Sequence, residues 1–579
     1  MNTTQTFKMS RLAQSLLLLL LGLAGSAWAA TPDAGSVLRD ETRREQAPAP
    51  LLPPKAQAPT DEKRTTDLGP KTRFTGFRVV GLSSLLEAEA QRFLAPFAAE
   101  PLSMDGLHRV AEKFEQWLRA QGLFTARAYV PPQEIKAGVV EIRVIEGRLE
   151  GVDIKRAPGA RISDDTLRAM VTGAQPTGTA LEQQRLERGL LLLNDLPATS
   201  ARAVLVPGQE LGGSRVLIEA AQGPTLAGNV ELDNTGNRYT GYWRLGATVL
   251  SNDPFGRGDQ WSLRGATSEG TSFVRAGYTT PLGSNGLKAG LALVDSRYKL
   301  CCDLAVGTPE SDGTATAVSG FVSYALVRTR QSNLNASLNW AERTFINRSL
   351  SITTSDKKSA SLTLALSGDR SDLTGLTGQG GYSTYSLQWV NGQLDLDGWA
   401  ADRAQDANSA QSHGGYDKLS VQGSHLLRLT KDTALYASLS GQLASKNLDS
   451  SEKFVLGGPQ GVRAYGSGEA SGDEGWLASV EWRREISPKW GFVAFADYGE
   501  VTLHKNTWAN WNAANVGVPN SYSLSGAGVS AVWTPTAGSQ ITATMATRLA
   551  DNPARDASGN DSDGLNTQVR FWVQGSLAF

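Results

Sequence analysis

An arginine and an aspartate in the carboxyl-terminal part of the chain have the types and surroundings of a buried ion pair. Arg463 lies in the middle of GGPQGVRAYGSGEASGDEGW, residues 457–476, and glycines this dense let a loop fold tightly into a confined space. Asp497 lies on the alternating segment GFVAFADYGE, on the same face as Val493 and Phe495. A guanidinium and a carboxylate can share two parallel hydrogen bonds. The pattern therefore predicts that Arg463 pins its loop to the strand of Asp497, whereas a loop arginine without such a carboxylate would simply be solvated.

No other residues have the spacing of a catalytic or metal site. The four histidines, His108, His413, His425 and His504, are scattered without ligand spacing, which favours surface or structural roles over a metal site. No serine or cysteine has a local nucleophile signature, and the sequence contains no phosphate-binding or dinucleotide-binding glycine motif. We therefore expect no catalytic residues, no metal and no cofactor, and we expect that the chain is not an enzyme.

The two cysteines, Cys301 and Cys302, are adjacent in the sequence. Two neighbouring cysteines cannot build a disulfide framework. A vicinal disulfide and a soft-metal site are two alternatives, and the interpretation that we favour is a pair of bystanders in a loop.

Residues 224–579 alternate in the way that a transmembrane β-barrel requires. In Asn333 to Trp340, asparagine and serine occupy one face while leucine, alanine and tryptophan occupy the other, and Leu435 to Leu443 repeats the pattern. Polar side chains toward a wet lumen and apolar side chains toward lipid produce this alternation, and the region has room for about sixteen antiparallel strands. On such a wall Asp497 cannot face lipid cheaply, so we expect it to face the lumen.

The connections between these strands alternate in length. We expect short periplasmic turns near residues 253–258, 281–285, 328–330, 431–432, 487–489 and 534–537. We expect long extracellular loops near residues 297–316, 343–358, 391–416, 444–474, 501–521 and 548–565. A soluble β-sandwich would also alternate along its strands, but the alternation of loop lengths favours the barrel.

The chain ends in an amphipathic strand whose last residue is Phe579. Val569, Phe571 and Val573 share the face of Phe579, and Arg570 lies on the other face. A last strand that pairs with the first removes both open edges of the sheet. An amphipathic last strand ending in phenylalanine also resembles the signal by which bacterial outer-membrane barrels are recognised for membrane insertion.

The first 29 residues have the pattern of a secretory signal peptide. Lys8 and Arg11 precede an apolar run, residues 16–23, and an A-x-A cleavage site follows at residues 27–29. A membrane-spanning helix needs about 20 apolar residues, which is twice the length of this run. The sequence therefore predicts export of a mature chain that begins near Ala30.

Composition also favours a barrel. No apolar run after the signal approaches the length of a membrane-spanning helix, and the chain has 61 glycines, 14 tryptophans and 13 tyrosines but only 20% charged residues. The formal net charge of -1 argues against a nucleic-acid-binding protein, because neutralising phosphates requires a basic surface.

A tethered helix and two small domains are predicted between the signal and the barrel. Residues 30–71 contain a short charged helix, Asp33 to Glu45, followed by a Pro/Ala-rich, semi-rigid linker. Residues 72–148 and residues 149–223 each follow the order strand, helix, helix, strand, strand. We expect a helix that can dock and leave again, and an α+β domain that is used twice.

These segments resemble the transporters of two-partner secretion, which export filamentous haemagglutinins and haemolysins and belong to the superfamily of POTRA-bearing outer-membrane barrels. In that family a VRGY-type motif lies at the tip of the long loop after the eleventh strand, and an F-x-D motif lies on the thirteenth. The residues that match the first motif, with alanine in place of the usual glycine, are Gly461, Val462, Arg463, Ala464, Tyr465 and Gly466. Phe495 and Asp497 match the second motif, on the strand that we also count as the thirteenth.

The resemblance implies a function, a location and a set of partners. It implies a cell outer-membrane transporter whose periplasmic POTRA domains capture an unfolded, haemolysin-like or adhesin-like exoprotein. The amino-terminal helix then vacates the pore, and the exoprotein passes through the lumen and folds outside. The implied partners are this exoprotein, outer-membrane lipid and the barrel-assembly machinery, with no nucleic acid, for a transporter that we expect to be monomeric.

Three other functions compete with export. A barrel-assembly factor of the same superfamily would insert other proteins into the membrane, but two POTRA units and a detachable helix favour the exporter. A passive porin has no use for two chain-binding periplasmic domains. A barrel-anchored enzyme is the weakest alternative, because the sequence offers no catalytic set.

Overall fold

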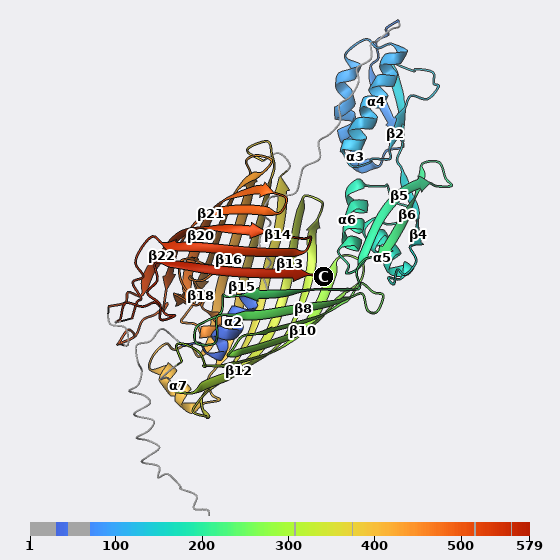
Figure 1. The fold of residues 1–579 in the computed structure, drawn as a ribbon. Coiled ribbons are helices and arrows are strands. Elements are labelled where there is room, and N and C mark those ends of the chain that lie inside the picture. The colour runs from blue at the N-terminus through green and yellow to red at the C-terminus, as the bar shows by residue number, and fades with distance from the viewer. Residues whose placement is uncertain (1–30, 45–69, 306–308, 373–374, 514–516, 557) are drawn as a thin grey trace, which may run out of the picture.

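The computed structural model describes residues 31–44, 70–305, 309–372, 375–513, 517–556 and 558–579. The predicted signal peptide and the Pro/Ala-rich linker lie outside these residues. Two small α+β units are stacked at one end of a large β-barrel, and helix α2 (Ala34–Arg44) lies inside the barrel (Figure 1).

The first α+β unit packs a three-stranded sheet against helices. Its elements are β1 (Gly76–Val80), α3 (Ser84–Leu94), the 3-10 helix η1 (Ala95–Ala98), α4 (Met104–Ala120), β2 (Arg127–Tyr129) and β3 (Val139–Ile145). The sheet order is β1-β3-β2, with β1 parallel to β3. Helix α4 begins at Ser103, whose hydroxyl accepts a hydrogen bond from Gly106 N at 2.9 Å. Its apolar face, with Phe114 and Leu118, is fully buried against Ile142 of the sheet.

The second α+β unit repeats this order. Its elements are β4 (Arg148–Arg156), α5 (Asp164–Ala174), α6 (Gln183–Asn194), β5 (Thr199–Pro207) and β6 (Gly213–Gln222). The sheet order is β4-β6-β5, so β5 is an outer strand. Leu186 and Leu193 of α6 are buried with Ile218 in the core of this second unit. The predicted order of strand, helix, helix, strand, strand is confirmed in both units.

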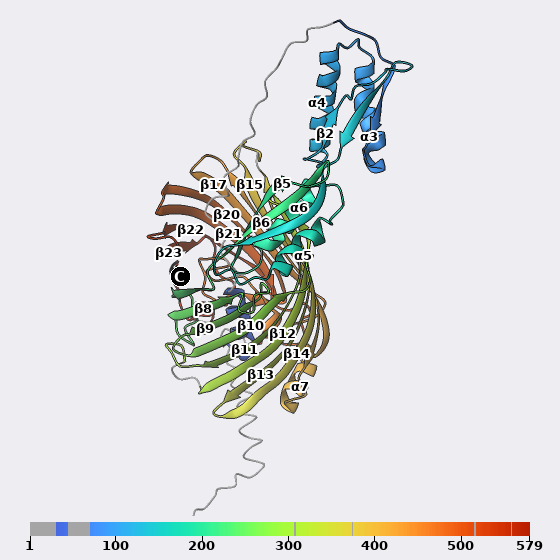
Figure 2. The same ribbon diagram turned by 90° about the vertical axis from the view of Figure 1, so that its right-hand side faces the viewer.

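The second unit is bonded to the end of the barrel. Arg328, at the end of β12, donates two hydrogen bonds to the Asp195 carboxylate at 2.7 and 2.6 Å. Arg188 of α6 donates to the carbonyl oxygen of Ala325 at 2.5 Å. Figure 2 shows this unit seated over the barrel end, with the first unit farther away. The short turns that are predicted to be periplasmic therefore lie at this end of the barrel.

The barrel is one closed antiparallel sheet of sixteen strands. In chain order they are β7 (Leu226–Asp233), β8 (Arg244–Asn252), β9 (Gln260–Thr267), β10 (Thr271–Pro281), β11 (Leu287–Lys299), β12 (Ser311–Arg328), β13 (Ser332–Ser349), β14 (Ile352–Asp372), β15 (Gly381–Asp395), β16 (Gly414–Arg428), β17 (Thr433–Ala444), β20 (Glu474–Ser487), β21 (Trp490–Thr502), β22 (Ser521–Trp533), β23 (Ser539–Arg548) and β24 (Val569–Ala578). The predicted barrel of about sixteen strands is thus confirmed.

The two faces of the wall differ as the alternation predicts. On β13, Leu338 and Trp340 are more than two-fifths exposed on the outer face, whereas Phe345 and Asn347 of the opposite parity are buried inside. Large exposed apolar side chains recur on the other strands and form the surface that lipid covers. No helix among the described residues is both long and apolar enough to cross a membrane.

One predicted loop is wrong. The long loop expected near residues 343–358 does not exist, because β13 continues to Ser349 and β14 starts at Ile352. Leu350 and Ser351 alone connect them, with φ angles of 50° and 64° that are typical of a tight hairpin. These two strands extend beyond the length that a membrane needs, so their outer ends are polar and resemble a loop in sequence. The opposite connection, between Asp372 and Gly381, is a periplasmic turn that the sequence analysis missed.

The last strand closes the barrel. Strand β24 pairs with β7, and Phe579 and Gly228 exchange two backbone hydrogen bonds, of 2.9 and 3.0 Å. The sheet consequently has no open edge. The aromatic ring of Phe579 lies on the exposed outer face.

Candidate functional site

The loop between β17 and β20, residues 445–473, packs against the inside of the barrel wall, and we call it the lumen loop. It contains η2 (Ser450–Glu452), β18 (Phe454–Val455) and β19 (Ser471–Gly472). Leu456, Val462 and Tyr465 of this loop are fully buried, in a cluster with Phe495 of β21 and Leu524 of β22. An apolar core of this kind holds the loop against strands β20 to β23.

Glycine is required at one place in this loop and at one place on the wall that the loop touches. A Cβ atom on Gly461 would lie 2.0 Å from the carbonyl oxygen of Leu456, so no other residue fits there. A Cβ on Gly526 of the wall would lie 2.6 Å from the Cβ of Ala464. The wall is thus hollowed opposite Ala464, which explains how an alanine is accommodated where the VRGY-type motif usually has glycine.

Arg463 and Asp497 are in direct contact. Arg463 donates from Nε to Oδ2 of Asp497 at 2.9 Å and from Nη2 to Oδ1 at 2.7 Å, and its backbone N donates to Oδ2 at 3.1 Å. The guanidinium carbon lies 3.4 Å from the ring centroid of Phe495. Asp497 is 2% exposed and belongs to β21, the thirteenth strand of the barrel. The bidentate pair is therefore buried at the wall, on the lumen side.

Three further partners of Arg463 have no signal in the motif. Its Nη1 donates to Glu481 Oε1 at 2.8 Å, and its Nη2 donates to Ser479 Oγ at 3.0 Å. The indole nitrogen of Trp572 donates to the carbonyl oxygen of Arg463 at 2.8 Å. Glu481 and Ser479 both lie on β20 and have the same parity, which is the signal that could have identified them. The loop tip is thus bonded to β20, β21 and β24.

Helix α2 begins with a reciprocal cap. Asp33 accepts a hydrogen bond from Ser36 N at 2.8 Å, and Ser36 Oγ accepts one from Asp33 N at 2.9 Å. The predicted helix, Asp33 to Glu45, is therefore present with its first residue as the cap, while Glu45 lies outside the described residues. Arg43 and Arg44 lie in the last turn, where a positive charge interacts favourably with the helix dipole.

The apolar face of α2 is narrow and packs on the barrel wall. Ala34, Val37 and Leu38 are buried in a cluster with Phe273 of β10 and Phe345 of β13. The helix lies inside the barrel in both orientations of the ribbon (Figures 1 and 2). It occupies the part of the lumen next to strands β9 to β13, whereas the lumen loop packs on strands β20 to β23.

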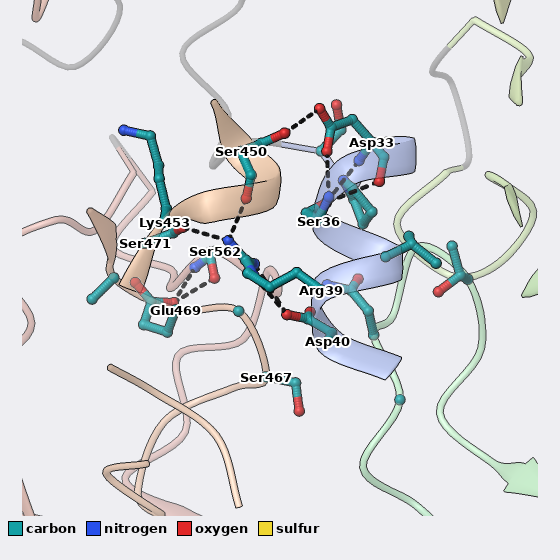
Figure 3. Close-up of a pocket in the computed structure, with 18 of the residues that line it drawn as sticks. Asp33, Ser36, Arg39, Asp40, Ser450, Lys453, Ser467, Glu469, Ser471 and Ser562 are labelled. Carbon is teal, nitrogen blue, oxygen red and sulfur yellow. Dashed lines mark hydrogen bonds and ion pairs between the residues drawn. The ribbon is translucent and has the colours of Figure 1, made fainter. Parts of the chain in front are cut away.

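The polar face of α2 is bonded to the lumen loop (Figure 3). Arg39 donates to the carbonyl oxygen of Ser450 at 2.7 Å and to Ser471 Oγ at 3.1 Å. Arg43 donates to the carbonyl oxygens of Val455 and Gln460 at 3.0 and 2.9 Å. All four of these partners belong to the lumen loop, so the helix and the loop stabilise one another's position.

One buried ion pair joins α2 to the wall. Arg244, at the start of β8, donates to Glu41 Oε2 at 2.7 Å, and both side chains are at most 5% exposed. A buried charge that loses its partner is strongly destabilised. This pair therefore fixes the position of the helix in the lumen.

The segment of the lumen loop that α2 touches most is itself anchored to the wall by charges. Lys357 of β14 contacts Asp449 at 2.6 Å, and Lys418 of β16 and Arg343 of β13 contact Glu452 at 2.6 and 2.7 Å. Burial opposes ionisation of Asp449, but the nearby Lys357 outweighs it and lowers the pKa of Asp449 to about 2. The segment η2 is thus a fixed seat for the helix.

A polar cavity of about 500 Å³ separates α2 from the returning part of the lumen loop. Figure 3 shows Arg39 and Asp40 of the helix on one side and Lys453, Ser467 and Glu469 of the loop on the other. Its lining carries charges of both signs beside apolar side chains such as Val37 and Leu503, so the cavity can hold water.

The remaining predicted residues lie close to this region, except Phe579. Tyr465 donates from its hydroxyl to the carbonyl oxygen of Ala550 at 2.8 Å. A Cβ on Gly466 would lie 2.8 Å from Asp563 Oδ2, so this position also requires a small residue. Phe579 lies at the periplasmic end of the wall, and its role as an insertion signal stays a prediction.

The two cysteines form a vicinal disulfide in the loop after β11. This was the less favoured alternative of the sequence analysis, and the interpretation of Cys301 and Cys302 as bystanders is corrected. Sequence separation does not tell whether two adjacent sulfur atoms are joined.

The histidines differ in their surroundings. His504 lies edge-on to Trp508 and Trp511, and burial, followed by the charge of Lys453, lowers its pKa to about 4. His413 lies beside Asp395 and Asp397, with potential ligand atoms within 4.8 Å of one another, a grouping that linear spacing does not reveal. The backbone N of Leu396 donates to His413 Nδ1 at 3.3 Å, which occupies one of its two nitrogens.

Comparisons with known proteins agree with this arrangement. The family described as haemolysin secretion/activation protein ShlB/FhaC/HecB matches residues 212–520, and the ShlB-type POTRA domain matches residues 73–147. The heme/hemopexin transporter protein HuxB of Haemophilus influenzae (strain 86-028NP) is 26% identical over 491 residues, which cover 82% of this chain and 85% of the relative. The outer membrane transporter CdiB of Dickeya dadantii is 25% identical over 434 residues, which cover 70% and 71%.

The fold matches a solved structure along almost its whole length. CdiB from Escherichia coli superposes with a TM-score of 0.73 at 22% identity, over 95% of this chain and all of that chain. At this level of identity, the likeness shows a common architecture of barrel and periplasmic units.

Proposed function

The chain belongs to the haemolysin secretion/activation family ShlB/FhaC/HecB, an outer-membrane transporter family of two-partner secretion, and we propose that it exports an unfolded partner exoprotein through the lumen of its barrel. Its barrel lies in the outer membrane and its POTRA units lie in the periplasm. The observation that carries the proposal is helix α2, which fills part of the lumen without being part of the wall.

Helix α2 is the removable part of the pore. Its apolar contact is small, with three buried side chains, and water can replace the loop carbonyls that accept hydrogen bonds from Arg39 and Arg43. The Glu41–Arg244 pair is costly to bury but not to separate into water, where both charges are solvated. The helix therefore docks reversibly, and its departure opens a passage along strands β9 to β13.

The outer strand β5 of the second POTRA unit is the capture edge. Both backbone polar groups of Ala201 bond to the Asn194 side chain, so odd-numbered residues of β5 direct their N–H and C=O groups away from β6. Leu205 has this parity and is 37% exposed. Main-chain pairing with an extended segment accepts many sequences, which suits an unfolded exoprotein.

The ion pair of Arg463 and Asp497 keeps the lumen loop against the wall, so that the passage has a fixed cross-section. Neither residue lines the space that α2 leaves, since both are buried between the loop and β21. Their part in export is to position the loop.

The exported partner is haemolysin-like or adhesin-like, and the family description and the name of one relative, a hemolysin transporter protein, support the first of these. It interacts with the POTRA units and the lumen while unfolded, and the barrel itself is inserted by the barrel-assembly machinery, with Phe579 as part of the signal. The transporter is a monomer without cofactor or catalysis. The comparisons favour neither an assembly factor nor a passive porin.

Locking the helix in place should block export reversibly. A Cβ built on Gly35 would lie 3.1 Å from the Cβ of Ser451 and 2.8 Å from Ser450 Oγ. Cβ atoms in disulfides are about 3.5–4.5 Å apart, so a slight separation of the helix and the loop lets the two cysteines join. The double variant Gly35→Cys, Ser451→Cys should therefore lose nearly all export when oxidised and regain it when a dithiol reductant is added. The measurement is the amount of exoprotein secreted into the medium. The exoprotein is the one encoded by the gene next to that of the transporter.

The single variants Gly35→Cys and Ser451→Cys, assayed with and without reductant, control for the substitutions and for the native disulfide. Wild-type export by the double variant, with the new disulfide demonstrated by mass spectrometry, would contradict passage through the space of α2.

A further inference from the structure

The part of the lumen loop that leads outward from Arg463 is held by a second loop. Residues 465–469 contact residues 549–556 and 558–568, which connect β23 and β24 and which we call the terminal loop. Besides the bond from Tyr465 to Ala550, the contact centres on Glu469, which is 2% exposed. This contact is separate from the Arg463–Asp497 pair, which lies deeper at the wall.

The carboxyl group of Glu469 is surrounded by donors of the terminal loop. Oε1 accepts a hydrogen bond from Asn552 Nδ2 at 2.9 Å, and Oε2 accepts two from Ser562, from N at 2.8 Å and from Oγ at 2.5 Å. Burial, followed by the neighbouring Asp561 carboxylate, raises the pKa of Glu469. A buried carboxyl group is costly unless its oxygens are bonded, so these three donors specify its position.

The terminal loop is in turn bonded to the barrel wall. Asp561 pairs with Arg548 at the end of β23 and with Arg570 of β24, the latter at 3.1 Å. Arg570 also donates to Asp563 Oδ1 at 2.9 Å. The donors that meet Glu469 are thereby held by two strands of the wall.

Helix α2 does not contribute to this contact, although it lies near it. Arg44 of the helix and Ser467 of the lumen loop both donate to the carbonyl oxygen of Thr235, at 2.7 and 2.8 Å. When the helix leaves, the lumen loop loses its bonds from Arg39 and Arg43 but keeps the bonds of Glu469.

We propose that Glu469 is a positioning residue that clamps the outer part of the lumen loop to the terminal loop, so that the lumen loop keeps its place when helix α2 leaves the pore. The inference rests on the proposed function only in requiring that the helix leaves. Deleting residues 33–45 reproduces that state whether or not anything is exported.

The test uses a variant from which only residues 33–45 are deleted, and Ala470→Cys is the reporter. Ala470 is 6% exposed while helix α2 is in place and lines the cavity beside it, so the chain without the helix supplies the parental labelling rate. The native cysteines are joined in a disulfide and do not react. On intact cells, a membrane-impermeant maleimide should label the Glu469→Ala form at least about tenfold faster, because hydrogen bonds to a charged group are lost. Glu469→Gln keeps one acceptor but turns its amide NH2 toward one of these donors, so its labelling rate should lie between those of the parent and of Glu469→Ala.

Two further arms keep the result decisive. Removing the side-chain donors instead, by Asn552→Ala with Ser562→Ala, should raise labelling in the same way, and this variant replaces Glu469→Ala if the latter fails to insert. Insertion is checked by the heat-dependent migration of the folded barrel. Equal labelling rates in the parent and in an inserted clamp variant would overturn the proposal. If the clamp variants label faster as expected but the unaltered transporter exports no exoprotein, the proposed function is overturned and the role of Glu469 stands.

Discussion

Alanine in place of Arg463 or Asp497 should nearly abolish export while the barrel remains inserted. Arg463→Ala leaves the Asp497 carboxylate buried without its counter-charge, which costs about 3–5 kcal/mol. Asp497→Ala leaves Arg463 with Glu481 as its remaining counter-charge, so its effect should be the smaller of the two. The equilibrium constant for docking of the lumen loop should fall accordingly, by at least about a hundredfold for Arg463→Ala. The wall itself is unaffected, since its strands are joined by their own backbone ladders. The measurement is the exoprotein in the medium, relative to folded barrel in the outer membrane.

Two substitutions calibrate this result. Arg463→Lys keeps the charge but not the two-pronged geometry, so its export should fall between those of the alanine variant and the parent. Arg484→Ala, at an exposed arginine of β20, should export normally. Parental export by both alanine variants would refute the role of the pair in positioning the loop.

Proline in place of Leu205 should also reduce export, by about fivefold or more. Proline removes the backbone N–H that points outward from β5, and each lost main-chain hydrogen bond weakens capture by about 1 kcal/mol, before the steric effect of the ring. Pairing with β6 should survive, because the bonds to β6 come from residues of the other parity. The natural Pro207 has the same outward parity, as expected of proline on an edge strand. Export should fall, and so should the affinity of the purified full-length transporter for the unfolded exoprotein.

The matched control is Leu205→Thr, which removes the same side chain but keeps the N–H. It should export close to the parental level. If the threonine variant fails as severely as the proline variant, the leucine side chain and not strand pairing captures the exoprotein.

The architecture could be predicted from the sequence because it depends on periodic patterns. Polar and apolar residues alternate along β13 and β17, and two α+β units repeat the same order of elements. Both signals are local and survive in a single sequence. The family match and the sixteen-stranded barrel confirm the fold class and the resemblance.

Only part of the candidate site could be predicted from the sequence. Arg463 and Asp497 could be paired because one lies in a dense glycine loop and the other interrupts the apolar residues around it. Glu481 was missed because EWRREIS, residues 481–487, carries charges on both faces, and Ser479 was missed because serine is common along the strands. The partners of the α2 arginines are backbone carbonyls, which every residue possesses and which therefore leave no mark in a sequence. The role of these residues in export stays a prediction.

The two corrections have physical reasons as well. The ends of β13 and β14 project beyond the membrane, where a strand no longer needs an apolar face and looks like a loop. The state of Cys301 and Cys302 depends on the local backbone, which spacing does not specify. The contact of Glu469 with the terminal loop joins residues about ninety positions apart, beyond the reach of local patterns.

Passage of the exoprotein through the lumen is tested most directly by a photo-crosslinking amino acid placed on β13 while the exoprotein is stalled in transit. In place of Phe345, which lies under α2, it should crosslink to the exoprotein. In place of Trp340, on the lipid face of the same strand, it should not. Crosslinks at Trp340 and none at Phe345 would contradict export through the barrel.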